Sequence, residues 1–189
     1  MVDEDALVGL DIETTGLDPH KHRVLAAALA ATDGTRVLVF EDEVHLLGEL
    51  ERLVSGLAPH AAIVTWNGEE FDMPFLATRF EERLVPSTLR VVPTRDVGKY
   101  GRPLFHAEWG SRRHVDIAAH YKDWAQSLGV PWNLKPVAKA VLRVKPVEVD
   151  RSGSAISQLD PEAIAQYVAS DAEITLSLAV RLATTLEPA

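Results

Sequence analysis

Residues 9–18, GLDIETTGLD, place two carboxylates at the end of a segment that has the apolar character of a buried strand. Side chains alternate along a strand, so Asp11 and Glu13 point to one face while Leu10 and Ile12 point to the other. Two neighbouring anions beside a hydrophobic core repel each other, and we therefore expect a cation between them. The stretch predicts a core strand that carries a functional site at its carboxyl end.

The pattern on either side of this stretch predicts a mixed α/β fold. Apolar runs bounded by turn residues predict strands at about residues 6–13, 23–31, 35–40 and 61–66. Apolar residues that recur every three or four positions predict helices at about residues 43–57, 70–84, 116–128, 134–141 and 161–186. The Asp33-Gly34 pair predicts a hairpin turn between the second and third strands. We therefore expect a mixed sheet with three antiparallel first strands and flanking helices.

Two irregular regions complete this scheme. Residues 85–113 are interrupted by proline and glycine and are expected to be mostly loop, with one strand near residues 89–92. The polar stretch 150–154 is expected to be a loop before the last helix. Asp160 is the predicted N-cap of that helix, and Pro161 is its predicted first residue.

Length and composition predict an ordinary globular protein. The chain has 189 residues, 47% of them hydrophobic, and is expected to form a single domain, 1–189. It contains no cysteine, which excludes disulfides, thiolate nucleophiles and cysteine-bound zinc. No secretory leader or membrane-spanning run is recognisable, so a cytoplasmic location and no membrane partner are expected.

The charge of the chain is distributed unevenly. The formal net charge is −9, but residues 90–145 hold 11 Lys and Arg against 4 Asp and Glu. This basic island is either a solvated face or a track for a polyanion beside an acidic site. Arg112 and Arg113 are its predicted phosphate contacts. Three aromatic residues between its cations either stack on bases or only pin a long loop: Tyr100, Phe105 and Trp109.

Two more carboxylates lie where apolar residues are expected. Asp72 falls in the first turn of the helix after the strand at 61–66, where helix capping alone would also explain an anion. Asp171 falls in the middle of the apolar stripe of the last helix, with Tyr167 one turn earlier on the same face. An unpaired carboxylate on such a stripe would cost several kcal/mol. Asp171 therefore indicates a buried polar site.

Four carboxylates and one phenol form an oxygen-only ligand set, which suits Mg²⁺ or Mn²⁺. Such a set can hold two divalent ions that stabilise charge at a phosphoryl centre. For Asp11 and Glu13, ion pairing with Arg or Lys at a strand end is the alternative. The chain has no P-loop, dinucleotide fingerprint, nucleophile elbow or zinc-protease motif, and its histidines lack metal-ligand spacing.

The order LDIETTG (10–16), WNGEEFDMPFL (66–76) and YVASD (167–171) closely resembles the three motifs of the DEDD superfamily of 3′–5′ exonucleases, whose domain has the ribonuclease H-like fold. The Tyr-x-x-x-Asp form of the third motif is that of the DEDDy branch. The stretches HVDIAAHY (114–121) and NLKPVAKAVL (133–142) are most similar to the proofreading exonuclease domain of family B DNA polymerases.

The resemblance implies a role for each matching carboxylate. Asp11 would bridge two Mg²⁺ or Mn²⁺ ions, Glu13 and Asp171 would complete the first ion site, and Asp72 would hold the second ion. Tyr167 would position the attacking water.

The resemblance also implies contacts to nucleic acid and an activity. Thr14 lies where the family approaches the terminal 3′-hydroxyl, and Asn67 and Phe71 lie where it contacts the terminal nucleotides. We therefore expect a metal-dependent 3′–5′ exonuclease that acts on single-stranded nucleic acid, DNA preferred, and releases 5′-mononucleotides. A 3′–5′ exoribonuclease or short-oligonucleotide hydrolase is one alternative, because no group in the sequence is identified that reads the 2′-position. A non-catalytic nucleic-acid-binding module is the other, and the four intact carboxylates count against it.

Overall fold

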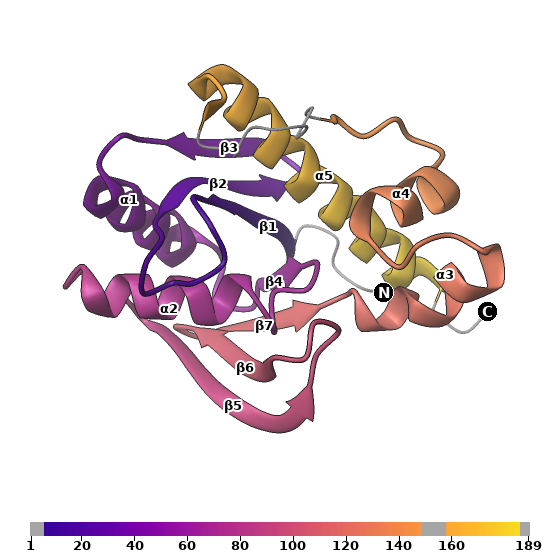
Figure 1. Cartoon of the computed structure of the whole chain (residues 1–189), viewed down its shortest axis with the longest axis horizontal. Coiled ribbons are helices and arrows are strands. Elements are labelled where there is room, and N and C mark those ends of the chain that lie inside the picture. Colours follow the sequence, from indigo (N-terminus) through magenta and orange to yellow (C-terminus); the bar gives the residue numbers. More distant parts are fainter. Residues whose placement is uncertain (1–5, 149–157, 186–189) are drawn as a thin grey trace.

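The computed structural model describes residues 6–148 and 158–185, and Figure 1 shows one sheet with helices packed on it. In this described part of the chain, seven strands form the sheet in the order β3-β2-β1-β4-β7-β6-β5. The central strands β1, β4 and β7 are parallel, and the other neighbours pair antiparallel. The strands are β1 (Leu7–Thr14), β2 (Val24–Ala31), β3 (Gly34–Val39), β4 (Ala62–Thr65), β5 (Leu89–Val97), β6 (Pro103–Trp109) and β7 (Arg112–Asp116).

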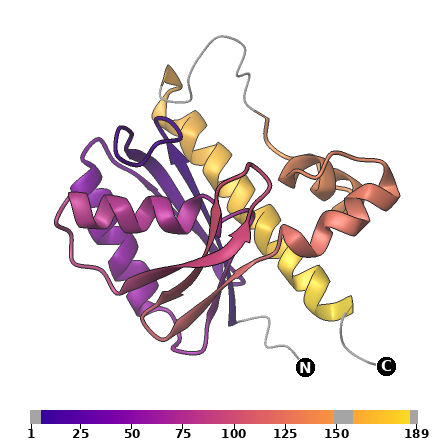
Figure 2. The same ribbon diagram turned by 60° about the horizontal axis from the view of Figure 1, so that its bottom comes forward.

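Helices cover both faces of the sheet. They are α1 (Glu43–Gly56), α2 (Asp72–Glu82), α3 (Lys122–Leu128), α4 (Leu134–Leu142) and α5 (Pro161–Thr185), with a 3₁₀ turn, η2, at Ala119–Tyr121. One core lies beneath α1 and α2, and α5 with α3 and α4 covers the opposite face. Figure 2 shows α5 crossing the sheet with the α3–α4 segment beside it. None of the described helices is long and apolar enough to cross a membrane.

The alternation predicted for the first strand is confirmed. Leu10 and Ile12 are buried in the core beneath α1 and α2. Asp11 and Glu13 belong to the other face, where they meet a carboxylate from α5. The predicted α/β fold, with three antiparallel first strands and flanking helices, is confirmed as well.

Gly9 brings α5 onto β1. A Cβ atom at Gly9 would lie 2.3 Å from the carbonyl oxygen of Ala172, so any other residue would push the helix away. Asp171 is the neighbour of Ala172 on α5. The glycine therefore sets the distance between Asp171 and the carboxylates of β1.

The strand predicted near residues 89–92 is present as the first part of β5, but the prediction that the rest of 85–113 is loop is wrong. Residues 89–97 and 103–109 form the antiparallel hairpin β5–β6, and β6 also pairs with β7. β5 is an edge strand, where Pro93 is tolerated because one side of the strand needs no ladder hydrogen bonds. Most of its side chains, such as Val92 and Val97, are exposed, so the apolar alternation that identifies a strand is missing.

The predicted helix at 116–128 begins later, because Asp116 ends β7 and the first helical turn starts at Ala119. The last helix begins as predicted. Pro161 is its first residue, and Oδ1 of Asp160 accepts a hydrogen bond from the backbone N–H of Ala163 at 2.8 Å. The helix extends to Thr185, while its predicted end at 186 and the predicted loop at 150–154 lie outside the described residues.

Candidate active site

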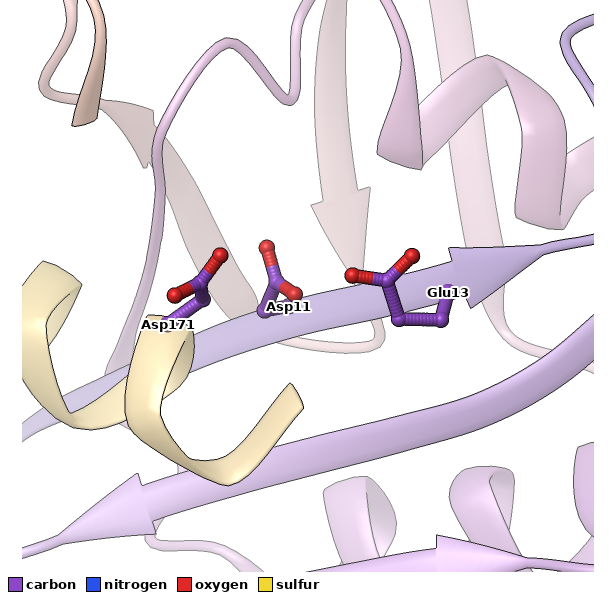
Figure 3. A group of neighbouring side chains, drawn as sticks. All are labelled: Asp11, Glu13 and Asp171. Atoms are coloured by element: carbon purple, nitrogen blue, oxygen red, sulfur yellow. The ribbon is translucent and has the colours of Figure 1, made fainter. Parts of the chain in front are cut away.

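Three of the four predicted metal ligands meet beside β1. Asp11 and Glu13 extend from β1 and Asp171 extends from α5, and Figure 3 shows their carboxylates on the same side of the strand. One carboxylate oxygen of each residue lies within 4.8 Å of the other two. This carboxylate cluster joins two segments that are far apart in the sequence.

Asp72 lies outside this group of three, but its charge interacts with those of Asp11 and Glu13. It is buried at the first position of α2. Burial, together with the charges of Asp116 and Glu13, raises the pKa of Asp72 to about 8, although hydrogen bonds from backbone N–H groups oppose the rise. Burial also raises the pKa of Asp11 well above its usual range, and the charges of Asp72, Asp171 and Glu13 add to the effect. The crowded anions therefore favour a cation among them.

A lysine from α4 supplies one such cation. The Nζ atom of Lys135 lies 3.1 Å from Oδ1 of Asp171, and its charge opposes the rise in the pKa of Asp11. The same ammonium group lies 3.5 Å from the ring centroid of Tyr167, which is buried on α5. A cation near Asp11 and Glu13 is expected from the sequence, but Lys135 is not among the predicted site residues, because it lies outside the segments that carry the carboxylates.

Pockets open beside the carboxylates. A pocket of about 360 Å³ is lined by residues that include Asp11, Asp72 and Phe71, and a second of about 290 Å³ reaches Asp171. The two pockets share four lining residues: Asp11, Trp66, Asn67 and Tyr100. A third pocket of about 340 Å³ shares four others with the first: Leu17, Glu70, Phe71 and Arg102. Together they form a groove that passes Asp11, Asp72 and Asp171 and is lined by aromatic rings.

Two of the three residues predicted to contact the terminal nucleotides line this groove, and the side chain of the third is hydrogen-bonded within a turn. Asn67 has a left-handed backbone, with φ of 68°, and borders both pockets beside Asp11. Phe71 borders the first and third pockets. The side chain of Thr14 is buried, and its hydroxyl donates to the carbonyl oxygen of Gly16 at 2.8 Å. The hydroxyl proton of Thr14 is therefore already used within this turn.

Asp116 holds the turn that carries Asn67. Its carboxylate accepts hydrogen bonds from the backbone N–H groups of Asn67, Glu69 and Ala118 at 2.9, 3.1 and 2.9 Å. These bonds connect the end of β7 to the segment between β4 and α2. Asp116 is not among the residues predicted from the sequence, because its role depends on a contact between segments that are distant in the sequence.

Glu70 holds the loop of the β5–β6 hairpin against the groove. Its buried Oε1 atom accepts the backbone N–H groups of Tyr100 and Arg102 at 2.8 and 3.3 Å. The loop fits closely, since a Cβ atom at Gly98 would lie 2.4 Å from Oε2 of Glu70. Glu70 was also missed, because nothing in its local sequence distinguishes it from a surface carboxylate.

The basic island divides into two parts in the structure. Tyr100, Arg102 and Phe105 line the groove. Trp109 is only 1% exposed, and its indole N–H donates to Oε2 of Glu51 at 2.7 Å. Trp109 therefore anchors its strand to α1 and is not available to stack on a base.

Arg112 is a structural residue and is not retained as a nucleic-acid contact. It is buried, and its guanidinium donates to the carbonyl oxygens of Ser55 and Leu57 at the end of α1. Arg113 is exposed, but it lies in register with Ala62 and, through it, with Leu7. Arg113 is thus about 13 Å from Asp11 along the strand direction, and Arg112, one residue earlier, is about 17 Å away, since a strand rises about 3.3 Å per residue.

Arg112→Ala should lower the free energy of unfolding by about 2–3 kcal/mol, because buried carbonyl groups lose a charged donor. Arg113→Ala is the matched control and should change it by less than about 0.5 kcal/mol, as expected for an exposed residue. Urea unfolding of both variants measures this difference. If Arg112→Ala is as stable as the parent but binds single strands more weakly, Arg112 contacts nucleic acid as the sequence predicts.

Comparison with known proteins places this architecture in a family. The sequence model of the RNase_H superfamily matches residues 8–159. The chain is 32% identical over 154 residues to DNA polymerase 1 of Saccharolobus solfataricus, covering 77% of this chain and 16% of that protein. It is 26% identical over 153 residues to DNA polymerase 1 of Aeropyrum pernix, covering 79% of this chain and 15% of that protein.

A solved structure agrees with these matches. The family B DNA polymerase from Pyrobaculum calidifontis superposes with a TM-score of 0.72 at 25% identity, covering 94% of this chain and 24% of that one. The chain thus spans a small part of each of these relatives. Because the family match covers most of its residues, including β1 with its two carboxylates, the chain belongs to the RNase H superfamily.

Proposed function

We propose that this chain is a metal-dependent 3′–5′ exonuclease that hydrolyses the terminal phosphodiester of single-stranded nucleic acid, DNA by preference, and releases 5′-mononucleotides. Membership of the RNase H superfamily and similarity to DNA polymerases support a nuclease-type function. The observation that carries the proposal is the meeting of Asp11, Glu13 and Asp171 beside a groove that also contains Asp72.

The carboxylates fit divalent metal ions. All the donors are oxygen atoms, which Mg²⁺ and Mn²⁺ prefer. The raised pKa of Asp11 reflects burial among like charges, a cost that a bound cation would relieve. Asp11, Glu13 and Asp171 would hold one ion, and Asp11 with Asp72 would hold the other. When bound, such ions acidify water and stabilise negative charge on the phosphoryl oxygens.

The other residues of the chain would orient the reaction. The phenol of Tyr167, one turn before Asp171 on α5, would hydrogen-bond the attacking water and align it with the phosphorus atom. The water oxygen forms a new bond to phosphorus, and the bond from phosphorus to the 3′-oxygen of the preceding nucleotide breaks. One proton of the water passes through solvent to that 3′-oxygen. The products are a 5′-mononucleotide and a shortened strand with a new 3′-hydroxyl.

The groove favours an unpaired strand end. Trp66, Phe71 and Tyr100 present rings on which bases separated from their partners can stack, each contact contributing about 1–3 kcal/mol. Arg102 adds a positive charge beside the same pocket. A single strand offers unpaired bases, whereas a duplex would first have to be opened. The preference for DNA rests on the similarity to DNA polymerases.

Glu70→Ala should raise the KM for a single-stranded substrate by about tenfold, a cost of about 1.4 kcal/mol, because the loop with Tyr100 and Arg102 loses its anchor. The stabilisation by Mn²⁺ should be unchanged, since Glu70 is not one of the proposed metal ligands and its Oε1 atom is hydrogen-bonded to the hairpin loop. Steady-state kinetics and thermal unfolding measure the two effects. Glu81→Ala, an exposed change on α2, is the control. A parent-like KM for Glu70→Ala would exclude the hairpin loop from substrate binding.

One assay tests the proposed function directly. End-labelled DNA and RNA of matched sequence, single- and double-stranded, are incubated with Mg²⁺ or Mn²⁺ and resolved at single-nucleotide steps. We expect stepwise shortening from the 3′ end, fastest for single-stranded DNA, and no reaction in excess chelator. A 3′-phosphate should block the reaction, and a 5′ block should not.

The same assay distinguishes the alternatives. Faster degradation of RNA or of very short oligonucleotides would favour an exoribonuclease or an oligonucleotide hydrolase. Cutting of circular single strands would show an endonuclease. Binding of single strands without release of nucleotides under any metal condition would indicate a non-catalytic module.

A further inference from the structure

We propose that Lys135 is a built-in competitor of the divalent ions: its ammonium group neutralises the metal-free carboxylate cluster and leaves Asp171 when an ion binds. The inference rests on the proposed metal site, but it concerns a residue outside the predicted ligand set. It assigns to α4 a role in setting the metal affinity of the site.

The position of Lys135 puts its charge at the ligand atoms. Nζ lies 3.1 Å from Oδ1 of Asp171, and the two side chains are only 17% and 10% exposed. Asp171 in turn belongs to the group whose ligand atoms lie within 4.8 Å of one another. Water screens charges weakly at such a partly buried site, so the ammonium group acts on the whole cluster.

The ammonium group has two further partners that are not carboxylates. It donates to the backbone carbonyl oxygen of Val147 at 2.7 Å, and it lies 3.5 Å from the ring centroid of Tyr167. Val147 is itself held against α5, because its N–H donates to Oγ of Ser170 at 3.2 Å. Lys135 therefore keeps a hydrogen bond and a cation–π contact when it gives up Asp171.

Competition follows from these contacts. A divalent ion that binds Asp171 must break its ion pair with Lys135 and must approach a like charge. Both effects lower the affinity of the site for the ion. In the metal-free protein, the same ion pair reduces the repulsion among Asp11, Glu13 and Asp171. Lys135 thus stabilises the empty site and weakens the loaded one.

Mn²⁺ titration of the protein without nucleic acid tests the proposal, with calorimetry for affinity and thermal unfolding for stability. Lys135→Met keeps most of the apolar stem and removes the charge. It should bind Mn²⁺ about tenfold more tightly, because a like charge within about 4 Å of an ion at a partly buried site is worth at least that much. Its metal-free form should melt about 4 °C lower or more, because a partly buried carboxylate loses its partner.

Three further variants sharpen this test. Lys139→Met is the matched control, because Lys139 lies one turn later on α4 and its exposed ammonium pairs with Glu148. It should change neither quantity. Lys135→Gln removes the charge but keeps a donor for Val147, and it should also bind Mn²⁺ more tightly. Lys135→Arg keeps the charge and should bind Mn²⁺ as the parent does.

The outcomes separate this proposal from the proposed function. Parent-like or weaker Mn²⁺ binding by Lys135→Met and Lys135→Gln would overturn the competition and leave the metal site itself in place. Absence of Mn²⁺ binding by the parent would overturn the metal site and the competition together. Tighter binding by both charge-removing variants, with Lys139→Met unchanged, is the result that we expect.

Discussion

Asp11→Asn is expected to lower the turnover of the proposed nuclease by at least about 10³-fold and to remove most of the stabilisation by Mg²⁺ or Mn²⁺. Asp11 borders both pockets and belongs to the carboxylate cluster, so its loss would affect both proposed ion sites. The metal supplies several kcal/mol of charge stabilisation in such reactions, which corresponds to this fall in rate. Single-turnover kinetics and thermal unfolding with and without metal measure the two effects.

The same substitution should make the metal-free protein more stable. Burial and three neighbouring carboxylates oppose the ionised form of Asp11, and a neutral amide removes that cost. Asp33→Asn, at an exposed turn between β2 and β3, is the control and should alter neither activity nor metal response. Full activity of Asp11→Asn, or an unchanged metal-induced shift in Tm, would contradict the proposed metal site.

Tyr167→Phe is expected to lower turnover by about 10²-fold, the contribution of a positioned proton-transfer or water-orienting group. The phenyl ring would still fill the buried position on α5 and would still face the ammonium group of Lys135. Metal binding and the free energy of unfolding should therefore change little. Kinetics at saturating substrate, with Mn²⁺ titration as the second readout, measures this separation.

Tyr121→Phe is the matched control for Tyr167→Phe. The buried hydroxyl of Tyr121 donates to the carbonyl oxygen of Leu178 at 2.7 Å, so its removal should lower stability by about 1 kcal/mol and leave turnover unchanged. Equal turnover of Tyr167→Phe and the parent would assign Tyr167 to packing against Lys135. The water would then have to be oriented by another group.

The local pattern of the sequence was enough to predict which faces carry the proposed ligands. Asp11 and Glu13 share a strand face because side chains alternate, and Asp171 lies on the buried stripe of α5 because a helix repeats every 3.6 residues. These periodicities belong to single segments, so they can be predicted without knowledge of the fold. The α/β architecture and the antiparallel start followed from the same kind of reasoning.

The β5–β6 hairpin could not be predicted in this way, because its pattern depends on its place in the sheet. An edge strand that is exposed on much of its surface needs no apolar alternation and tolerates Pro93. Its loop is held by Glu70, which is adjacent to it only in the folded chain. Only its first part, near residues 89–92, was therefore expected to be a strand, and the rest was expected to be loop.

The partners of individual charges were likewise decided by tertiary structure. Arg112 and Arg113 are neighbours in the basic island, yet one is buried on carbonyl groups of α1 and the other is exposed. Lys135 lies in the same island, and its ammonium group reaches Asp171 on another helix. The sequence by itself determined the fold class and the faces of the carboxylates, because these follow from local periodicity. Only the packing of α4 and α5 against the sheet decided which cation meets them, because a charge finds its partner through long-range contacts.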